Sequence, residues 1–365
     1  MNKLILIALS LFLLQGCFLK ENPINSSMKG DGFLKEILKN KENYEIQIIY
    51  TEIKRDKEGE PDFMDFEFQV DENTYFYPAS TIKLPIVILT LDKINELRSE
   101  GINVSLKSKI TLSPLDQEMS LTQKDSITSF QNLIADILLV SDNSASNVLI
   151  DFIGYNHFNA KMNQAGFNKT YLNHKFSPDP NYTIDWEIKT MFNDLISSNE
   201  ERDIVTADDN ILGLKKGEKK FKDGIVELGS LDFSQKNRFS IIDMHNIIKR
   251  IIFPSKFDDD NAFNLNVEDY DFLRYWMSRF THEDLGNKFT TDKKYFESYN
   301  KFFIHGADTV VTNKNIRVYN KIGQAYGTST DNAYIKNYQD DVEFFLTATI
   351  YTNKNNIIND NVYEY

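Results

Sequence analysis

Strand-like segments lie near both ends of this 365-residue chain, and that arrangement constrains its fold more than any other feature. Between Asp65 and Val70, apolar residues alternate with polar ones, which is the period of a half-buried strand. Residues 44–53 near the start, and residues 316–323 and 342–352 near the end, are the other predicted strands. The sequence therefore predicts an α/β (α+β) protein, with one antiparallel sheet built from both chain ends and packed with helices.

Helical spacing of apolar residues fills the middle of the chain, which predicts an inserted, all-helical subdomain. The clearest pattern runs from Ile127 to Leu138 and stops at the sequence Ser-Asp-Asn. A second helix begins at once after this break and ends at Gly154, where glycine provides the C-cap. The other predicted helices cover residues 31–42, 81–97, 156–166, 185–197, 240–252 and 266–280.

One folded domain is predicted, from residue 31 to residue 353. Within it, residues 199–237 are charged, contain glycines and show no periodicity, which is typical of an insertion on the surface. This insertion either reshapes a cleft or binds a partner. Residues 354–365 are expected to form a C-terminal tail.

The N-terminus has the features of a secretory signal peptide. A cationic residue precedes an apolar run from Leu4 to Leu14, which is too short to span a membrane stably. Cys17 follows this run and is the only cysteine of the chain, so the exported protein has no internal disulfide. The prediction is a signal peptide over residues 1–16 and a polar tether over residues 17–30.

The segment that ends at Cys17 resembles the lipobox of bacterial lipoproteins, in which the cysteine is lipidated and becomes the new N-terminus. This resemblance implies lipidation of Cys17 and a location in the cell envelope. The body would then be held by lipid at the bacterial membrane, on its periplasmic or surface side. The alternative is a simple signal peptide with an incidental cysteine.

The charge balance argues against a nucleic-acid partner, because 54 acidic residues outnumber 41 basic ones and give a net charge of -13. The five histidines show no metal-ligand spacing, and no glycine-rich phosphate loop is present. No metal and no cofactor are therefore expected.

Ser80 and Lys83 stand three residues apart at the start of a strongly apolar helix. On a helix this spacing puts both side chains on one face, where Lys83 Nζ can reach Ser80 Oγ. Serine is a weak nucleophile until a base removes its proton, and a buried lysine with a lowered pKa can be that base. The same spacing recurs at Ser26 and Lys29, so the pair alone is weak evidence for a catalytic site.

Two further motifs give this pair its context. Ser141 and Asn143 lie in the short break between two predicted helices, which would direct both side chains into a cleft. As the alternative, Ser141 and Ser144 serve as helix caps. Lys321 and Gly323 lie on a predicted strand near the C-terminus, and Lys-x-Gly is equally weak evidence when it stands alone.

In this order, the motifs match the Ser-x-x-Lys, Ser-Asp-Asn and Lys-x-Gly set of serine β-lactamases and penicillin-binding proteins. From about residue 31 to residue 353 the chain resembles the class A β-lactamase-like serine hydrolases, which implies the β-lactamase-like fold. The resemblance also implies a role for each motif residue: Ser80 as the acylated nucleophile, Lys83 as its hydrogen-bonded base partner, Ser141 as the proton shuttle to the leaving nitrogen, Asn143 as the ligand of the substrate amide, Lys321 as the positive charge across the cleft, Gly323 and Gln324 as substrate-binding residues, and the backbone N–H groups of Ser80 and Gln324 as the oxyanion hole.

Two positions depart from the family pattern. Where class A β-lactamases carry the glutamate that activates the deacylating water, this chain has Ser177. Asp179, Asp185 or Glu187 would have to substitute, or else these three are only loop and capping residues. Ile322 replaces a threonine or serine whose hydroxyl helps bind a substrate carboxylate, and it is expected to line the cleft with methyl groups.

The predicted function is acyl transfer through an acyl-serine intermediate, with hydrolysis of β-lactams as one outcome. One alternative is a penicillin-binding or D,D-peptidase-like protein that deacylates slowly, and the other is a non-catalytic binding module of the envelope. The expected partners are a small-molecule amide or lactam, or a peptidoglycan-like substrate, and the membrane through the N-terminal lipid. The protein is expected to be a monomer.

Overall fold

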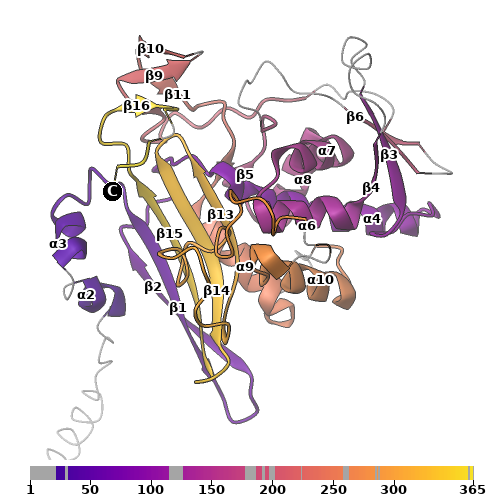
Figure 1. Ribbon diagram of the computed structural model, residues 1–365, viewed down its shortest axis with the longest axis horizontal. Helices are drawn as coiled ribbons and strands as arrows, with labels where there is room; N and C mark the ends of the chain where they lie inside the picture. The colour runs from indigo at the N-terminus through magenta and orange to yellow at the C-terminus, as the bar shows by residue number, and fades with distance from the viewer. Residues whose placement is uncertain are drawn as a thin grey trace, which may run out of the picture.

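A five-stranded antiparallel sheet combines the two ends of the chain (Figure 1). The computed structural model describes residues 22–28, 32–114, 126–176, 186–190, 194–196, 202–222, 224–257, 263–283, 286, 288–360 and 362–364. In their order across the sheet, the strands are β13 (Ile316–Ala325), β14 (Thr328–Asn337), β15 (Val342–Tyr351), β1 (Gln47–Arg55) and β2 (Pro61–Phe68). β1 pairs directly with β15, with Gln47 opposite Thr349. The predicted sheet from both chain ends is therefore confirmed.

Strand β14 was not predicted, because its sequence shows no alternation. Its residues are buried from Thr328 to Ile335, on both faces of the sheet. A strand covered on both faces does not alternate, and this one contains polar residues as well. Asp331 and Asn332 are only 2% and 0% exposed. These buried polar groups lie beside the candidate active site.

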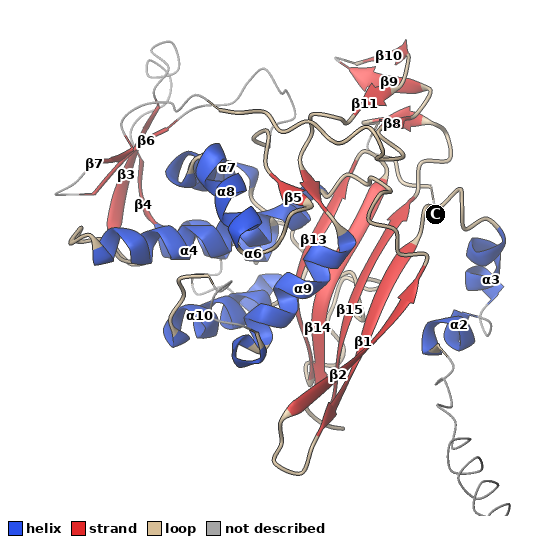
Figure 2. Ribbon diagram, turned by 180° about the vertical axis from the view of Figure 1, so that it is seen from behind, coloured by secondary structure: helices blue, strands red, loops and turns tan. Residues whose placement is uncertain are grey.

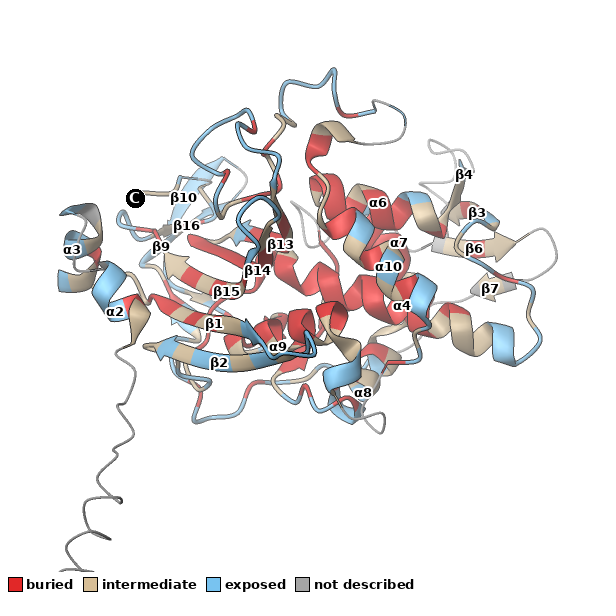
Figure 3. Ribbon diagram, turned by 90° about the horizontal axis from the view of Figure 1, so that it is seen from below, coloured by how far each residue is buried: buried red, intermediate tan, exposed pale blue. Residues whose placement is uncertain are grey.

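The core helix of the molecule is α4 (Lys83–Ser99), which follows a short 3₁₀ turn, η1 (Ala79–Ile82). α4 is buried from Lys83 to Asp92, as Figure 3 shows, because its apolar residues surround the helix on all sides. The remaining helices and short turns are α2 (Pro23–Met28), α3 (Gly32–Lys39), α6 (Phe130–Val140), α7 (Asn143–Ile153), α8 (Tyr155–Gln164), α9 (Ile241–Ile252), η2 (Pro254–Lys256), α10 (Val267–Met277) and η4 (Thr281–Glu283). α9 packs on β14 and β15, and α7 packs on α4.

The prediction of an all-helical subdomain is wrong, because this region also carries a small sheet (Figure 2). In spatial order its strands are β4 (Ser126–Ser129), β3 (Lys109–Pro114), β6 (Trp186–Thr190) and β7 (Asp194–Ile196). The predicted helix over residues 185–197 is therefore also wrong. Ile188 is fully buried and lies opposite Leu112 of β3, so pairing between strands overrides the local helical spacing.

The predicted insertion, residues 199–237, contains short strands that project from the molecule (Figure 1). They are β8 (Lys215–Lys216), β9 (Lys219–Lys222), β10 (Ile225–Leu228) and β11 (Leu231–Asp232). The predicted tail is not free, because β16 (Ile357–Ile358) pairs with β9 in parallel. Directly after the insertion, β12 (Arg238–Phe239) pairs with β5 (Thr170–Tyr171).

Part of the predicted tether is folded. In α2, Ile24 is buried in a cluster with Ile37 and Ile46, so the chain packs against the sheet before residue 31. The signal-peptide segment and Cys17 lie outside the described residues. Within the part of the chain that the structure describes, no helix is long and apolar enough to cross a membrane.

Candidate active site

The candidate nucleophile, Ser80, lies in η1, directly before α4. The preceding residue, Ala79, has a φ of 48°, an unfavourable backbone conformation for a residue with a Cβ. Ser80 lines a cavity of about 960 Å³. In the described part of the chain, no group forms a hydrogen bond with Ser80 Oγ. The turn therefore holds a hydroxyl that is free to react.

Lys83 is fully buried at the first residue of α4. Its Nζ donates hydrogen bonds to Asn143 Oδ1 and to the backbone oxygen of Ser141, each at 2.6 Å. The predicted hydrogen bond to Ser80 is not formed in this structure. Burial, and then the nearby charge of Lys321, hold the pKa of Lys83 well below its usual value, although Asp142 opposes the shift.

An uncharged Lys83 fits these contacts. A neutral amine has two N–H donors, which the two short bonds use, and one lone pair that remains available as a base. The ring of Phe176 lies 4.7 Å from Lys83 Nζ, so an apolar face covers one side of the amine. No carboxylate forms an ion pair with this lysine among the residues that the structure describes.

Ser141 occupies the break between α6 and α7, as predicted. It ends α6 with a φ of 58°, and Asp142 caps α7 by accepting a hydrogen bond from the Ala145 N–H at 2.7 Å. The left-handed turn directs Ser141 Oγ toward two lysines. Lys321 Nζ donates to this oxygen at 2.9 Å, and Lys83 Nζ lies 3.4 Å from it.

Lys321 is the second amine of the site, and it reaches Ser141 from β13. The side chain is 2% exposed, and its Nζ also donates to the Ile322 backbone oxygen at 2.9 Å. Burial lowers the pKa of Lys321 to about 7, against the opposing influence of Asp331. The three motifs that are distant in sequence thus meet at one hydroxyl.

Gly323 allows β13 to lie against the turn that carries Ser80. A Cβ at this position would be 2.6 Å from the Pro78 oxygen, 2.8 Å from the Thr81 nitrogen and 3.0 Å from the Ser80 nitrogen. These are backbone atoms, so only glycine fits without moving the strand. The close approach brings the next residue, Gln324, to the cavity that Ser80 lines.

Ile322 does not line this cavity among its described residues, contrary to the prediction. It is 7% exposed. Side chains alternate along a strand, so Ile322 and Lys321 point to opposite faces of β13.

A cluster of three buried polar side chains, Lys301, Asn320 and Asp331, lies near Lys321 and was not predicted from the sequence. Lys301 Nζ donates to Asn320 Oδ1 at 2.8 Å, and Asn320 Nδ2 donates to Asp331 Oδ1 at 2.8 Å. Burial lowers the pKa of Lys301 to about 7 and raises the pKa of Asp331 to about 6. The only signal was the presence of polar residues on strands next to the Lys-x-Gly motif.

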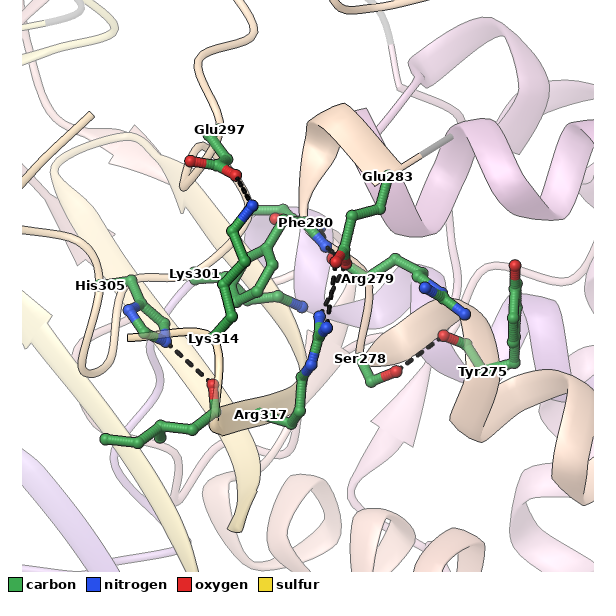
Figure 4. Close-up of polar contacts among 12 residues, drawn as sticks. Tyr275, Ser278, Arg279, Phe280, Glu283, Glu297, Lys301, His305, Lys314 and Arg317 are labelled. Atoms are coloured by element: carbon green, nitrogen blue, oxygen red, sulfur yellow. Dashed lines mark hydrogen bonds and ion pairs between the residues drawn. The ribbon is translucent and has the colours of Figure 1, made fainter. Parts of the chain in front are cut away.

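Figure 4 shows the surroundings of Lys301, whose side chain points toward the ion pair of Arg317 and Glu283. Arg317 Nη1 lies 2.7 Å from Glu283 Oε2. The guanidinium, acting with a backbone hydrogen bond from Phe280, keeps the pKa of Glu283 below its usual value in spite of burial. This pair fixes the start of β13, on which Lys321 lies.

Of the carboxylates proposed to replace the missing glutamate, only Glu187 is described. It lies on β6, forms an ion pair with Lys189 at 2.8 Å, and is not among the described lining residues of the Ser80 cavity. Ser177, Asp179 and Asp185 lie outside the described residues. Among the described residues, Glu187 thus lies in an ion pair with Lys189 and not at the Ser80 cavity.

One cluster in the described chain has the composition of a metal site: Asp92, Glu96 and His157. Lys161 fills it, with Nζ 3.0 Å from Asp92 Oδ1 and in a short ion pair with Glu96. Because the Lys161 ammonium group already pairs with both carboxylates, the cluster is an ion-pair network on α4 and α8. Sequence spacing did not reveal it.

The family of the chain follows from comparison with known proteins. The sequence matches the family described as the beta-lactamase enzyme family over residues 33–363. No curated protein matches the sequence. Among solved structures, the chain is similar to a beta-lactamase from Francisella tularensis, with 15% identity, coverage of 90% of each chain and a TM-score of 0.48.

Two further solved structures show the same level of similarity. A beta lactamase from Xanthomonas campestris pv. campestris has 13% identity, coverage of 87% of each chain and a TM-score of 0.48. The structure of PBP-A has 14% identity, with 84% of this chain and 81% of that chain covered, and a TM-score of 0.46. The family match spans most of the sequence, and this chain belongs to the beta-lactamase enzyme family.

Proposed function

We propose that this protein is a serine hydrolase that acts by acyl transfer, with Ser80 as the nucleophile. One observation carries the proposal: two buried lysines of lowered pKa meet at Ser141 Oγ, next to a serine whose hydroxyl is free. Buried lysines that only stabilise a fold are normally paired with carboxylates. The lone pair of an uncharged amine is instead what general base catalysis needs.

Acylation begins when Ser80 Oγ attacks the carbonyl carbon of an amide or lactam. Lys83, three residues along the same helical turn, accepts the Ser80 proton as the bond forms. The negative charge on the carbonyl oxygen is stabilised by the backbone N–H groups of Ser80 and Gln324, which the close packing of Gly323 brings together.

The C–N bond then breaks, and the leaving nitrogen takes the hydroxyl proton of Ser141. Ser141 recovers a proton from Lys83, so the proton released by Ser80 ends on the leaving group. The ammonium form of Lys321, 2.9 Å from Ser141 Oγ, stabilises the negative charge that develops on this oxygen. Acyl-Ser80 remains.

Hydrolysis of acyl-Ser80 requires a base for water. Among the described residues that line the cavity, the only carboxylate is Asp232, which is exposed and accepts a hydrogen bond from the Ser234 N–H at 2.8 Å. This observation favours a second candidate function, a penicillin-binding type of protein that is acylated quickly and deacylates slowly.

Labelling with a fluorescent penicillin tests the proposal. The purified full-length protein in detergent is expected to become labelled, and Ser80→Ala is expected to remain unlabelled. Ser26→Ala is the matched control, because Ser26 has the same spacing to a lysine but lies exposed on α2. Labelling of Ser80→Ala at the wild-type rate would contradict the assignment of the nucleophile.

The time for which the label persists distinguishes hydrolysis of the lactam from slow deacylation. Loss of label over minutes would establish hydrolysis, whereas persistent label would establish the slow penicillin-binding type. The absence of label on wild-type protein, together with no consumption of the penicillin, would contradict both lactam functions. It would favour another amide or ester substrate, or a non-catalytic binding module.

We also propose that Cys17 anchors the protein in the cell envelope. A bacterial cell that produces the chain and is fed an alkyne-tagged fatty acid is expected to lipidate the wild type but not Cys17→Ala. Tagging of both proteins, or of neither, would contradict the anchor.

A further inference from the structure

The insertion supplies one wall of the cavity that Ser80 lines, and this wall carries unpaired positive charge. Arg202 and Lys236 belong to the insertion, and His174 follows β5 in the body; all three line the cavity. In the described part of the chain, no carboxylate forms an ion pair with Arg202 or Lys236. Asp232 lies on the same wall but is exposed and bonded to its own loop.

Two buried asparagines fix the position of this wall. Asn173 Nδ2 donates to the Val205 oxygen at 2.6 Å and to the Gln235 oxygen at 3.2 Å, which joins the two ends of the insertion. Arg202 Nη1 donates to the Asn173 oxygen at 3.0 Å. Asn237 Oδ1 accepts hydrogen bonds from the backbone N–H groups of Asn173 and His174, at 2.7 and 3.0 Å. These contacts fix the Arg202 side chain and the backbone next to Lys236.

His174 has a free acceptor on this wall. Its ring stacks on Tyr77, with centroids 6.2 Å apart and planes 1° apart, and its Nδ1 donates to the Lys175 oxygen at 2.8 Å. Nε2 is buried and has no hydrogen-bond partner. Burial, together with the charges of Lys236 and Arg202, lowers the pKa of His174 to about 4.

Of the cations on this wall, Lys236 most clearly lacks an anionic partner that would offset the cost of its burial. Its side chain is half-buried, and burial alone lowers the pKa of its ammonium group. Lys175, also on the wall, is different because Asp151 pairs with it at 2.6 Å. A cation that is partly removed from water without a partner is unfavourable until an anion binds beside it.

The cavity lies on the acyl side of Ser80. Asn143 and Gln324 are among its lining residues, whereas Ser141 and Lys321, which serve the leaving nitrogen, are not among the described lining residues. A substrate bound at Ser80 therefore extends its acyl part, not its leaving group, along the insertion wall.

We propose that Lys236, Arg202 and His174 form a subsite for a carboxylate carried by the acyl part of the substrate. The proposal rests on the acyl-transfer function above. The substrate carboxylate would pair with the ammonium and guanidinium groups, and its charge would also favour a protonated His174 that donates from Nε2. Amides with an acidic acyl side chain are therefore the preferred substrate class.

Two penicillins that differ by one carboxylate test this subsite. Carbenicillin carries an additional carboxylate on the acyl side chain of benzylpenicillin, and both share the lactam ring. For the wild-type protein, the second-order acylation rate constant is expected to be roughly tenfold higher for carbenicillin. Lys236→Gln is expected to bring the ratio to within about twofold, and high salt is expected to reduce the wild-type ratio.

Lys219→Gln is the matched control, because Lys219 is an exposed lysine on β9 of the same insertion and is not among the lining residues. This variant is expected to keep the wild-type ratio. Lys236→Gln is expected to unfold at the wild-type temperature or above, since it removes an unpaired, half-buried charge. An unchanged ratio in folded Lys236→Gln would overturn the subsite.

A binding measurement separates this proposal from the acyl-transfer function. Phenylmalonic acid monoamide and phenylacetamide reproduce the two acyl side chains without a lactam ring. Titration calorimetry on Ser80→Ala is expected to show tighter binding of the acidic amide, and the preference is expected to be lost in the double variant with Lys236→Gln. Equal binding of both amides would overturn the subsite, even where Ser80 is acylated. The acidic preference in a protein that no penicillin labels would support the subsite and contradict only the lactam function.

Discussion

Lys83 and Lys321 contact the same hydroxyl, because Ser141 Oγ lies 3.4 Å from one Nζ and 2.9 Å from the other. Two amines so close cannot both hold a proton without strong repulsion, and burial favours the neutral forms further. The pair therefore supplies one base and one acid near neutral pH.

Lys83→Arg is expected to lower the rate of acylation by about 10²-fold or more, because a guanidinium group stays protonated and cannot accept the Ser80 proton. The measurement is the rate of fluorescent penicillin labelling. A buried arginine can also unfold the protein, so far-UV circular dichroism is the control that the variant is folded. A folded variant that labels at the wild-type rate would exclude Lys83 as the base.

The charge of Lys321 predicts an alkaline limb in the pH profile of acylation. With a pKa of about 7, this amine is charged below that pH and loses its proton above it, so the rate is expected to fall as the pH rises. Lys321→Arg keeps its charge at all these pH values, and its alkaline limb is expected to disappear. Stopped-flow labelling between about pH 6 and pH 9 measures both profiles. Identical alkaline limbs would contradict the role of Lys321.

Gly323→Ala is expected to destabilise the fold by about 1–3 kcal/mol and to slow acylation at least about tenfold. Its Cβ would lie 2.6 Å from the Pro78 oxygen and 2.8 Å from the Thr81 nitrogen, which pushes β13 away from the oxyanion hole. Gly32→Ala is the control, because nothing lies within 4 Å of a Cβ at that position. Urea unfolding and labelling rates are the two measurements, and equal behaviour of the two variants would refute the packing argument.

His245 predicts a loss of stability in mild acid. It is 2% exposed between Thr51 and Thr347, whose hydroxyls lie 2.6 and 2.8 Å from its ring nitrogens. Burial, and then the charge of Lys249, lower the pKa of His245 to about 3. The unfolded chain therefore binds a proton that the folded chain does not, once the pH falls below the usual histidine pKa.

The expected loss from this histidine is about 2 kcal/mol of unfolding free energy between about pH 7.5 and pH 5. Urea unfolding at both pH values measures it. His245→Gln, which keeps a hydrogen-bonding side chain but does not titrate, is expected to lose less stability over the same interval. An equal loss in both proteins would assign the acid sensitivity to other groups.

The sequence predicted the parts of the site that lie in continuous motifs. Ser80, Lys83, Ser141 and Lys321 each follow from a short pattern on a predictable element, and the structure brings the last three into contact. The hydrogen bond between Ser80 and Lys83 was not found. Lys83 bonds to Asn143 Oδ1 and to the Ser141 backbone oxygen instead, because a buried amine donates to the acceptors within its reach.

The parts that escaped prediction depend on contacts between distant segments. β14 is polar and buried on both faces, so Asp331 gives no periodic signal, and Lys301 is connected to it only through Asn320. Likewise, the insertion was recognised as irregular, but its position over the cavity depends on Asn173 and Asn237 in the fold. Local patterns contain no information about these pairings.

Peptide mapping by mass spectrometry after incubation with benzylpenicillin shows whether Ser80 forms the acyl-enzyme. The mass of one intact penicillin is expected on the peptide that contains Ser80, and no such adduct is expected on Ser80→Ala. An adduct on a different residue, or no adduct on folded protein that also leaves benzylpenicillin intact, would show that Ser80 is not the nucleophile.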